Sequence, residues 1–384
     1  MRRKMYSIAA LCIALAASST ILTSCEDGED KTTTEVSGEL ENGSTISGDI
    51  TSNTTLAEGY EYKLSGGVHV KEGATLTIKP GVKITAIDDD TPDYILIEQG
   101  AKIDAQGTAS NPIVMTSETP ENKWGGIHIC GKAHTNAESG SGSSEIGGAK
   151  YGGSDDKDNS GTLRYIRLEY TGFALDEEHE ANGISFYGVG SGTTVDHIES
   201  YKGGDDGFEF FGGSVNVNNM VSFDSSDDSF DWTEGWNGSA TNILAYQMSA
   251  EDDCLIEADN NGKNYDAVPV SRPTIKNAIL IGNGGDGRGI RLRAGTQVIL
   301  DNVVACGKNM PLTVETGQTE TALKNGDATI TNTTISANLN SKESIYTNED
   351  FIKDPTNNID ATGITIEAAK GLNSWLNESW IVLE

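Results

Sequence analysis

The sequence predicts an all-β protein whose main domain, residues 49–384, is a parallel β-helix, a solenoid of stacked coils. The chain contains 45 Gly in 384 residues, and long helical patterns are few. Short runs of alternating apolar residues recur between turn residues, as expected for β-strands. Similar segments also recur at a nearly constant spacing, which favours a solenoid over a sandwich.

The first repeated segment is a short strand with a central apolar residue. These central residues are Ile184, Phe208, Phe230, Leu255, Ile290 and Leu312. Successive members are separated by 24, 22, 25, 35 and 22 residues, and the longest step contains an insertion at 260–273. A period of 22–25 residues suits one coil, because coils stacked ~4.8 Å apart bury apolar faces that a single coil leaves exposed.

The second repeated segment begins with asparagine and alternates with the first along the chain. Its asparagines are Asn219, Asn242, Asn277, Asn302 and Asn332. Stacked in a turn, their side-chain amides are expected to hydrogen-bond from coil to coil. Tyr165 and His197 fit the equivalent positions upstream without the amide.

The N-terminus indicates export. Positions 2–4 are basic, and the apolar stretch 8–17 is too short to cross a bilayer, which needs ~20 apolar residues. Residues 1–24 are therefore interpreted as a signal peptide. The ending before Cys25 resembles a bacterial lipobox, which implies that Cys25 carries lipid; an ordinary signal peptide with an incidental cysteine is the alternative. Residues 25–48 are interpreted as a flexible acidic tether.

The charge limits the partners. The formal charge is −31 and becomes −34 once the three basic residues of the signal are removed. Such a fold repels DNA, RNA and anionic lipid, which excludes nucleic acid as a partner. Cys130, Cys254 and Cys306 lack metal-ligand spacing and are compatible with buried thiols or with one disulfide. The five His are scattered and predict no zinc site.

Several segments resemble a family of Bacteroidetes surface lipoproteins with β-helix cores. They are Gly73–Gly81, Gly107–Glu118, Trp124–Ala133 and Gly188–Glu199. The resemblance covers roughly residues 50–384 and implies a right-handed, pectin-lyase-like β-helix; the asparagine column is also similar to that of pectate-lyase-like proteins. The acidic cluster 26–30 resembles the export tags of such lipoproteins, which implies a lipid anchor in the outer membrane and exposure at the cell surface. A solvated linker, and a periplasmic location, are the alternatives.

The C-terminal end holds a second apolar group. It consists of Trp375, Leu376, Trp380 and Ile381. We expect these residues to cap the open end of the solenoid against edge pairing. A small appended hairpin is the alternative.

The sharpest functional signal is a ladder of acidic residues on consecutive predicted coils. The ladder consists of Asp205, Asp206, Glu209, Asp227, Asp228, Asp231, Asp252 and Asp253. Stacked carboxylates repel one another unless backbone N–H groups, protonation or a cation offset the charge. Calcium is the candidate cofactor, with Asp206, Asp228 and Asp253 as ligands. The alternative is that these aspartates cap the turns between strands.

Strand alternation extends this ladder into a candidate binding face. Glu209 and Asp231 are expected to face outward, because the opposite phase would bury them. Trp232 and Trp236 are candidates for stacking on sugar rings, with a place in the core as the alternative.

Two further features adjoin this face. Arg291 and Arg293 alternate on one strand, so they are expected to face outward together and to pair with the acidic ladder on the preceding coil. The insertion 260–273 is expected to wall a groove.

These patterns predict a non-enzymatic surface lipoprotein that binds a polysaccharide, host matrix or a surface protein. The alternative is a polysaccharide lyase or a glycoside hydrolase that uses the stacked Asp pairs. The tripeptide Asp252–Cys254 resembles the DDC of polygalacturonases, but the other motifs of that family are missing. A purely structural spacer is the third possibility.

Overall fold

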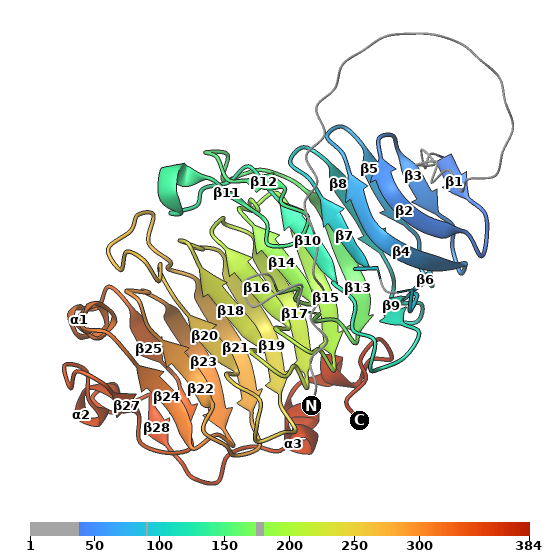
Figure 1. Cartoon of the computed structure of the whole chain (residues 1–384). Coiled ribbons are helices and arrows are strands. Elements are labelled where there is room, and N and C mark those ends of the chain that lie inside the picture. The colour runs from blue at the N-terminus through green and yellow to red at the C-terminus, as the bar shows by residue number, and fades with distance from the viewer. Residues whose placement is uncertain (1–37, 90, 174–179) are drawn as a thin grey trace, which may run out of the picture.

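The chain forms a parallel β-helix, as the repeat spacing predicts. The structure is a computed structural model and describes residues 38–89, 91–173 and 180–384. Coils follow one another along a single axis from the N-terminal to the C-terminal end (Figure 1). The predicted signal peptide, Cys25 and most of the predicted tether lie outside the described residues. The first described strands fall inside the predicted tether, so the solenoid begins before residue 49.

Each full coil contributes strands to three sheets, named A, B and C. Along one coil the chain passes through sheet A, the asparagine corner, sheet B and then sheet C. Sheet A contains β1 (Gly38–Leu40), β3 (Thr54–Leu56), β5 (Thr75–Ile78), β8 (Lys102–Gln106), β25 (Thr329–Thr331) and the first halves of six long strands. The long strands are β13 (Gly161–Glu169), β15 (Thr194–Tyr201), β17 (Asn216–Phe223), β19 (Ser239–Tyr246), β21 (Thr274–Ile281) and β23 (Ile299–Cys306). Their second halves belong to sheet B.

Sheet B is completed by shorter strands at both ends of the solenoid. They are the first parts of β2 (Thr45–Ile50) and β4 (Glu61–Val70), followed by β6 (Lys83–Ala86), β9 (Ile113–Ser117), β26 (Thr334–Ile335) and β28 (Asn358–Ile359).

Sheet C carries the candidate functional face. After the last parts of β2 and β4 it contains β7 (Tyr94–Ile97), β10 (Ile127–Cys130), β14 (Ile184–Tyr187), β16 (Phe208–Phe211), β18 (Phe230–Thr233), β20 (Ile256–Ala258), β22 (Arg288–Leu292), β24 (Met310–Val314) and β27 (Asn340–Ser341). A small antiparallel hairpin, β11 (Gly142–Ser143) and β12 (Lys150–Tyr151), follows a 3₁₀ turn at Glu138–Gly140 and lies outside the solenoid wall.

The asparagine column is confirmed and forms the corner between sheets A and B. Asn219, Asn242, Asn277 and Asn302 have φ between 53° and 59°, a left-handed conformation that asparagine tolerates. The Asn242 amide donates to Asn219 Oδ1 at 3.2 Å, and the Asn277 and Asn302 amides continue the chain at 3.0 and 2.8 Å. Asn332 also has positive φ, but its amide donates to Asp301 instead.

The core is a stack of inward-facing apolar side chains. Aromatic residues of successive coils stack directly: the rings of Phe186 and Phe210 lie 4.9 Å apart, and those of Phe208 and Phe230 lie 5.3 Å apart. Phe230 aligns with Ile256 and then Ile290. The predicted alignment through Leu255 is therefore wrong by one residue, although Leu255 itself is buried in the core.

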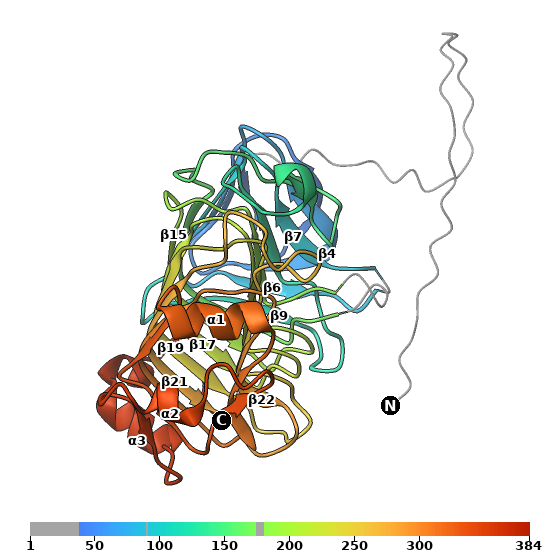
Figure 2. The ribbon, with the colours of Figure 1, turned by 90° about the vertical axis from the view of Figure 1, so that its left-hand side faces the viewer.

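The C-terminal end closes differently from the prediction. Helices α1 (Gly317–Asn325) and α2 (Asn348–Phe351) lie at the end of the solenoid, and Leu323 and Phe351 join its core (Figure 2). Helix α3 (Ile366–Leu372) and the 3₁₀ helix η2 (Ser374–Asn377) instead turn back along the outer face of sheet B. No helix in the described part of the chain is long and apolar enough to cross a membrane.

Candidate functional site: the carboxylate column on sheet C

The outer face of sheet C carries a row in which three consecutive coils each contribute an acidic side chain. Strand pairing aligns Glu209, Asp231 and Glu257, with Ser185 on the coil before them and Arg291 on the coil after them. The residues that flank this row in each strand point into the core, so the row faces outward. The outward direction predicted for Glu209 and Asp231 is thereby confirmed.

A second acidic row runs along the entry to these strands. The backbone N–H of Asp228 donates to Asp206 Oδ1 at 2.9 Å, and the N–H of Cys254 donates to Asp228 Oδ1 at 2.6 Å. Each aspartate thus caps the next coil, as the turn-capping alternative predicts.

The one-residue difference in register changes which acidic residues lie side by side on consecutive coils. Because Asp231 pairs with Glu257, Asp228 lies beside Cys254, and Asp253 follows the row of Asp205 and Asp227. Asp252 leaves both rows: its Oδ2 accepts from the N–H of Ser249 at 3.1 Å. The sequence alignment of Asp206, Asp228 and Asp253 as one row is therefore corrected.

The two rows together are called the carboxylate column. Their side chains form clusters in which the atoms that could bind a metal ion lie within 4.8 Å of one another. One cluster is Asp206, Glu209 and Asp231, and the next is Asp228, Asp231 and Glu257. Asp228 also lies in a cluster with Asp253 and Cys254, and in another with Asp206 and Asp227. The three predicted calcium ligands therefore do not form one cluster, but two of them, Asp206 and Asp253, each share a cluster with the third, Asp228.

Burial and mutual repulsion raise the pKa values of these carboxyls. Burial is the largest cause for Asp206, Glu209, Asp228 and Asp231, and neighbouring carboxylates raise their pKa values further. Burial likewise raises the pKa of Asp205 to about 8. Asp231 Oδ1 is buried and has no hydrogen-bond partner among the described residues. Protonation or a bound cation is therefore required to relieve the repulsion.

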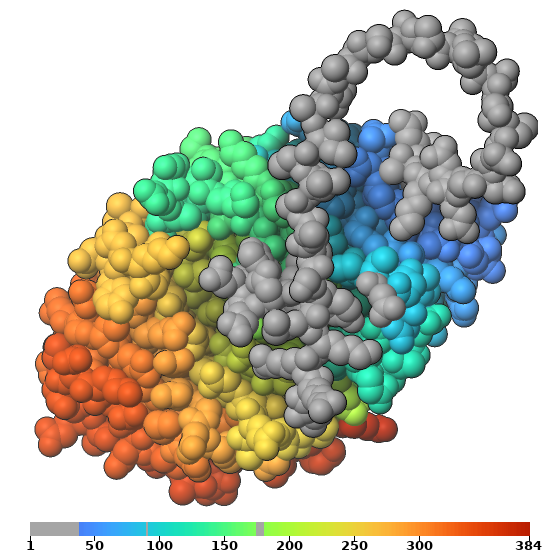
Figure 3. Space-filling model, viewed as in Figure 1, coloured from blue at the N-terminus to red at the C-terminus, as the bar shows by residue number. Residues whose placement is uncertain are grey.

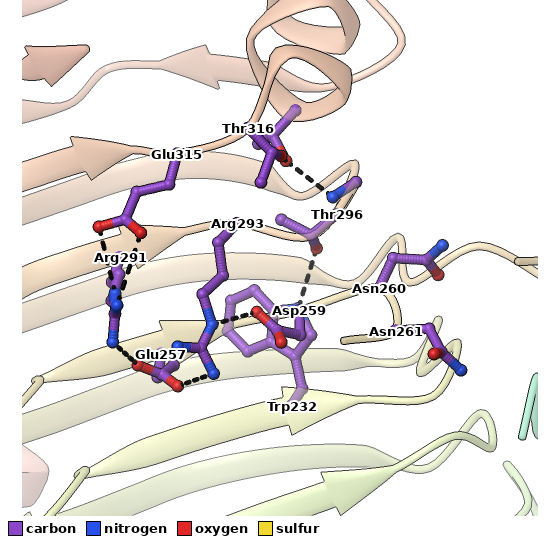
Figure 4. Close-up of polar contacts among 12 residues, drawn as sticks. Trp232, Glu257, Asp259, Asn260, Asn261, Arg291, Arg293, Thr296, Glu315 and Thr316 are labelled. Atoms are coloured by element: carbon purple, nitrogen blue, oxygen red, sulfur yellow. Dashed lines mark hydrogen bonds and ion pairs between the residues drawn. The ribbon is translucent and has the colours of Figure 1, made fainter. Parts of the chain in front are cut away.

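Two arginines pair with acids at the C-terminal end of the column, as Figure 4 shows. Arg291 Nη1 lies 2.7 Å from Glu257 Oε1, and its Nε lies 3.3 Å from Glu315 Oε1. Arg293 contacts Glu257 and lies 2.6 Å from Asp259 Oδ1. Both arginines pair with acids of the preceding coil, but these acids are Glu257 and Asp259, and the predicted pairing with Asp252 and Asp253 of the ladder is wrong. Asp206, Asp228 and Glu209 have no such ion pair in the described part of the chain.

The predicted aromatic face is wrong. Trp232 and Trp236 are both 0% exposed and belong to the solenoid core. The Trp232 indole N–H donates to Thr296 Oγ1 at 3.1 Å, and that of Trp236 donates to the Val215 carbonyl at 3.1 Å. Trp232 occupies an inward strand position, so neither ring is available to a ligand.

The sequence did not reveal other polar residues near the column, because the acids to which they hydrogen-bond are distant in the chain. The Asn182 amide donates to Glu209 Oε2 at 2.6 Å. The Tyr151 hydroxyl donates to Glu234 Oε2 at 2.7 Å, and that of Tyr187 donates to Glu145 at 3.3 Å. Glu145 lies in the Gly/Ser-rich loop before β12, where acidity was the only sequence signal.

The thiols complete the description of this region. Cys130, Cys254 and Cys306 are free and buried. Burial raises the pKa of the Cys130 thiol to about 12, so it is protonated at neutral pH. The disulfide alternative is excluded for these three cysteines.

Comparison with known proteins agrees with this architecture. A family model described as a pectate-lyase-like β-helix domain matches residues 48–381. No curated protein and no solved structure in the comparisons matches the chain. The match extends over most of the chain and over all three sheets. The chain therefore belongs to the family of pectate-lyase-like β-helix domains.

Proposed function

We propose that the protein is a lipid-anchored outer-membrane lipoprotein of the cell surface that binds glycan, without turnover, through a divalent cation held on the carboxylate column. Membership in a pectate-lyase-like family fits a carbohydrate-related role. The signal-like N-terminus with Cys25 and the acidic residues that follow it support the anchor and the outward location. Calcium is the expected ion, because it takes many oxygen ligands in flexible geometry.

The observation that carries the proposal is the uncompensated charge in the middle of the column. Glu209, Asp228 and Asp231 come from two adjacent coils and are linked by clusters with ligand atoms within 4.8 Å. Among the residues that the structure describes, no arginine is in direct contact with them. A divalent cation there would remove the repulsion and keep open coordination positions for sugar hydroxyls. No ring is needed on the face, which agrees with the burial of Trp232 and Trp236.

Asp231→Asn tests the cation site, because Asp231 belongs to both central clusters. We expect calcium to bind the purified protein and to raise its Tm, and Asp231→Asn to lose most of both effects. Isothermal titration and thermal unfolding, with calcium or with a chelator, measure the two. Glu121→Gln, an equal charge change at an exposed position away from the column, should behave like the wild type. Calcium that neither binds nor stabilises the wild type would refute the cation site.

Catalysis is the rival function, and the raised pKa values of paired carboxyls beside Arg291 and Arg293 favour it. A hydrolase would use one protonated and one ionised carboxyl, and a lyase would use calcium and a basic group. Incubation with a polysaccharide panel distinguishes the functions: new reducing ends or an unsaturated sugar that disappear in Asp231→Asn would establish turnover, while saturable binding without products supports the proposal.

The anchor has its own test. Cys25→Ala removes the thiol that would carry lipid. We expect the variant to leave the membrane fraction and to lose incorporation of labelled fatty acid, because membrane retention then lacks buried acyl methylenes worth ~0.8 kcal/mol each. Labelling of the variant equal to the wild type would contradict lipidation at Cys25.

A further inference from the structure

A pocket lies apart from the carboxylate column, between the insertion 260–273 and helix α1. It has a volume of about 580 Å³. The insertion follows β20, projects from the solenoid wall and stands out in yellow and orange (Figure 3). The predicted role of this insertion as the wall of a groove is confirmed. We propose that this pocket binds a segment of a neutral oligosaccharide, an assignment that rests on the proposed glycan role.

The pocket is held open by hydrogen bonds at its base, so it exists before any ligand arrives. Asn260 is 0% exposed, and its amide donates to the carbonyls of Tyr265 and Ala267 at 3.1 and 3.0 Å. Its Oδ1 accepts from the N–H of Ser271 at 2.8 Å. These contacts fix both ends of the projecting loop. A ligand therefore does not have to order this wall, which reduces the cost of binding.

The opposite wall of the pocket, helix α1, is linked to the insertion through the turn that contains Gly295. The Gly295 N–H donates to Thr319 Oγ1, in α1, at 2.9 Å. Gly295 has φ of +85°, and a Cβ there would lie 2.1 Å from the carbonyl oxygen of Tyr265. Glycine thus lets the turn between β22 and β23 approach the insertion closely, and the bond to Thr319 ties the same turn to α1.

The lining has the composition that sugars require. The Tyr265 ring is 40% exposed at one side of the pocket, beside apolar groups of Val268 and Ile345. The side chains of Gln297 and Gln318 make no hydrogen bond with other described residues, so their amides are free to donate to and accept from hydroxyl groups. An aromatic surface with a few polar groups is typical of small-molecule sites and matches the apolar face and hydroxyl edge of a sugar ring.

Charge selects the class of sugar. Asp266 and Asp327 are exposed members of the lining, and none of the described residues that line the pocket is a lysine or an arginine. The whole chain carries a formal charge of −31. Uronate or sulfate groups would be repelled, whereas neutral hydroxyls gain good acceptors. None of the carboxylate clusters found in the described residues includes a pocket residue, so binding here requires no cation.

Titration calorimetry in the presence of a chelator tests this site. The probes are cellohexaose, maltohexaose and mannohexaose, with trigalacturonate as the anionic comparison. We expect at least one neutral hexaose to bind and trigalacturonate to bind more weakly. Tyr265→Ala and Gln318→Ala should each weaken binding by about tenfold, whereas Tyr265→Phe should retain it because the ring remains. Lys263→Ala, an exposed change at the tip of the same loop, is the matched control.

The outcomes separate this pocket from the carboxylate column. Neutral-sugar binding that survives chelation and Asp231→Asn but falls in Tyr265→Ala supports the pocket. Binding that needs calcium and Asp231, and is unchanged in Tyr265→Ala and Gln318→Ala, overturns the pocket and leaves the proposed function standing. Tighter binding of trigalacturonate than of every neutral probe overturns the neutral class. Absence of glycan binding, with and without calcium, removes both proposals.

Discussion

The asparagines of the A–B corner each satisfy two local requirements. The backbone there has positive φ, which costs most L-residues ~1–2 kcal/mol and which asparagine tolerates. The side chain also hydrogen-bonds to its neighbours above and below: Asn242 donates to Asn219 and accepts from Asn277. Tyr165 and His197 occupy the same corner upstream and stack their rings 4.3 Å apart instead. The positive φ is therefore a property of the corner, whereas the row of side-chain hydrogen bonds requires asparagine.

Substitutions of Asn242 separate these two contributions. Asn242→Gly keeps the backbone conformation but loses two hydrogen bonds, for a loss of about 1–2 kcal/mol of stability. Asn242→Ala also strains the backbone and should lose about 1 kcal/mol more. Thermal and urea unfolding measure both, with exposed Asn325→Ala as the control. Equal effects of the alanine and glycine variants would contradict a role for the positive φ.

At the scale of elements, the C-terminal segment packs against the side of the solenoid. Trp380 is 0% exposed, and its ring lies 6.1 Å from that of Tyr165 and 5.4 Å from that of His197. The Val382 N–H donates to both carboxylate oxygens of Glu199 at 3.0 Å. The segment thereby covers apolar side chains on the outer face of sheet B, which belong to a cluster separate from the main core.

Trp380→Ala should release this segment without unfolding the solenoid. Truncating a buried tryptophan costs ~3–5 kcal/mol, and the loss falls on a short element with its own small cluster. Limited proteolysis followed by mass spectrometry should therefore show faster cleavage after about residue 364, while the circular dichroism of the solenoid persists. Leu372→Ala, at a side chain that is 73% exposed, should leave proteolysis unchanged. If the circular dichroism of the solenoid were lost as the segment became cleavable, the segment and the solenoid would unfold together.

A buried carboxylate helps to fix helix α1 in place. Glu320 is 0% exposed and accepts from Ser341 Oγ at 2.8 Å and from the N–H groups of Glu343, Ile345 and Tyr346 at 2.6–3.0 Å. These bonds favour the ionised form and hold its pKa below the ordinary value, against the opposing effect of burial. Unlike the column carboxyls, Glu320 is fully compensated, and it ties the helix to the chain that crosses the end of the solenoid.

At the scale of the whole molecule, folding buries acids at several places along the solenoid, both in the carboxylate column and outside it. Burial raises the pKa of Asp93 to about 7, of Asp205 to about 8 and of Asp252 to about 6. An unfolded aspartate has a pKa of about 3.9, so between these values the folded chain holds protons that the unfolded chain has lost. The stability that these groups contribute is present at low pH and is lost as the pH rises through their folded pKa values.

Stability without divalent cations should therefore fall as the pH rises from about 5 to about 8. Thermal unfolding in chelator, at fixed ionic strength, measures the slope. Below about pH 4 the trend should reverse, because carboxyls with lowered pKa values, such as Asp196 and Glu320, then lose their favourable ionised contacts. Calcium should reduce the slope between pH 5 and 8, since a cation replaces the protons. A Tm that rises steadily from pH 5 to 8 in chelator would contradict the uncompensated column.

The recurring patterns in the sequence predicted the solenoid, the asparagine column and the outward carboxylates. Each of these depends on a local rule repeated many times: side chains alternate along a strand, and asparagine favours a left-handed turn. Repetition made the inference firm, because a misread coil is corrected by its neighbours. That Arg291 and Arg293 pair with acids of the preceding coil followed from the same reasoning, although the identity of those acids did not.

The predictions that the structure contradicts concerned features with no local signal in the sequence. Residues 254–256 read Cys-Leu-Ile and are all 0% exposed, so alternation could not fix the register. The register is fixed by the pairing of Asp231 with Glu257 and by the cap of Asp228 on the N–H of Cys254. The hydrophobicity of Trp232 and Trp236 was compatible with a core or with a ligand face. The direction of strand β18 decided the place of Trp232, and packing of the following turn against Phe210 decided that of Trp236.

The sequence by itself determined the coil period, the corner and the sign of the charge on sheet C, because each arises from residue type and spacing. Only the tertiary structure decided which carboxylates meet, that the last residues lie along sheet B, and that the insertion and α1 enclose a pocket. These arrangements depend on contacts between residues far apart in the chain, and such contacts leave no periodic trace in the sequence.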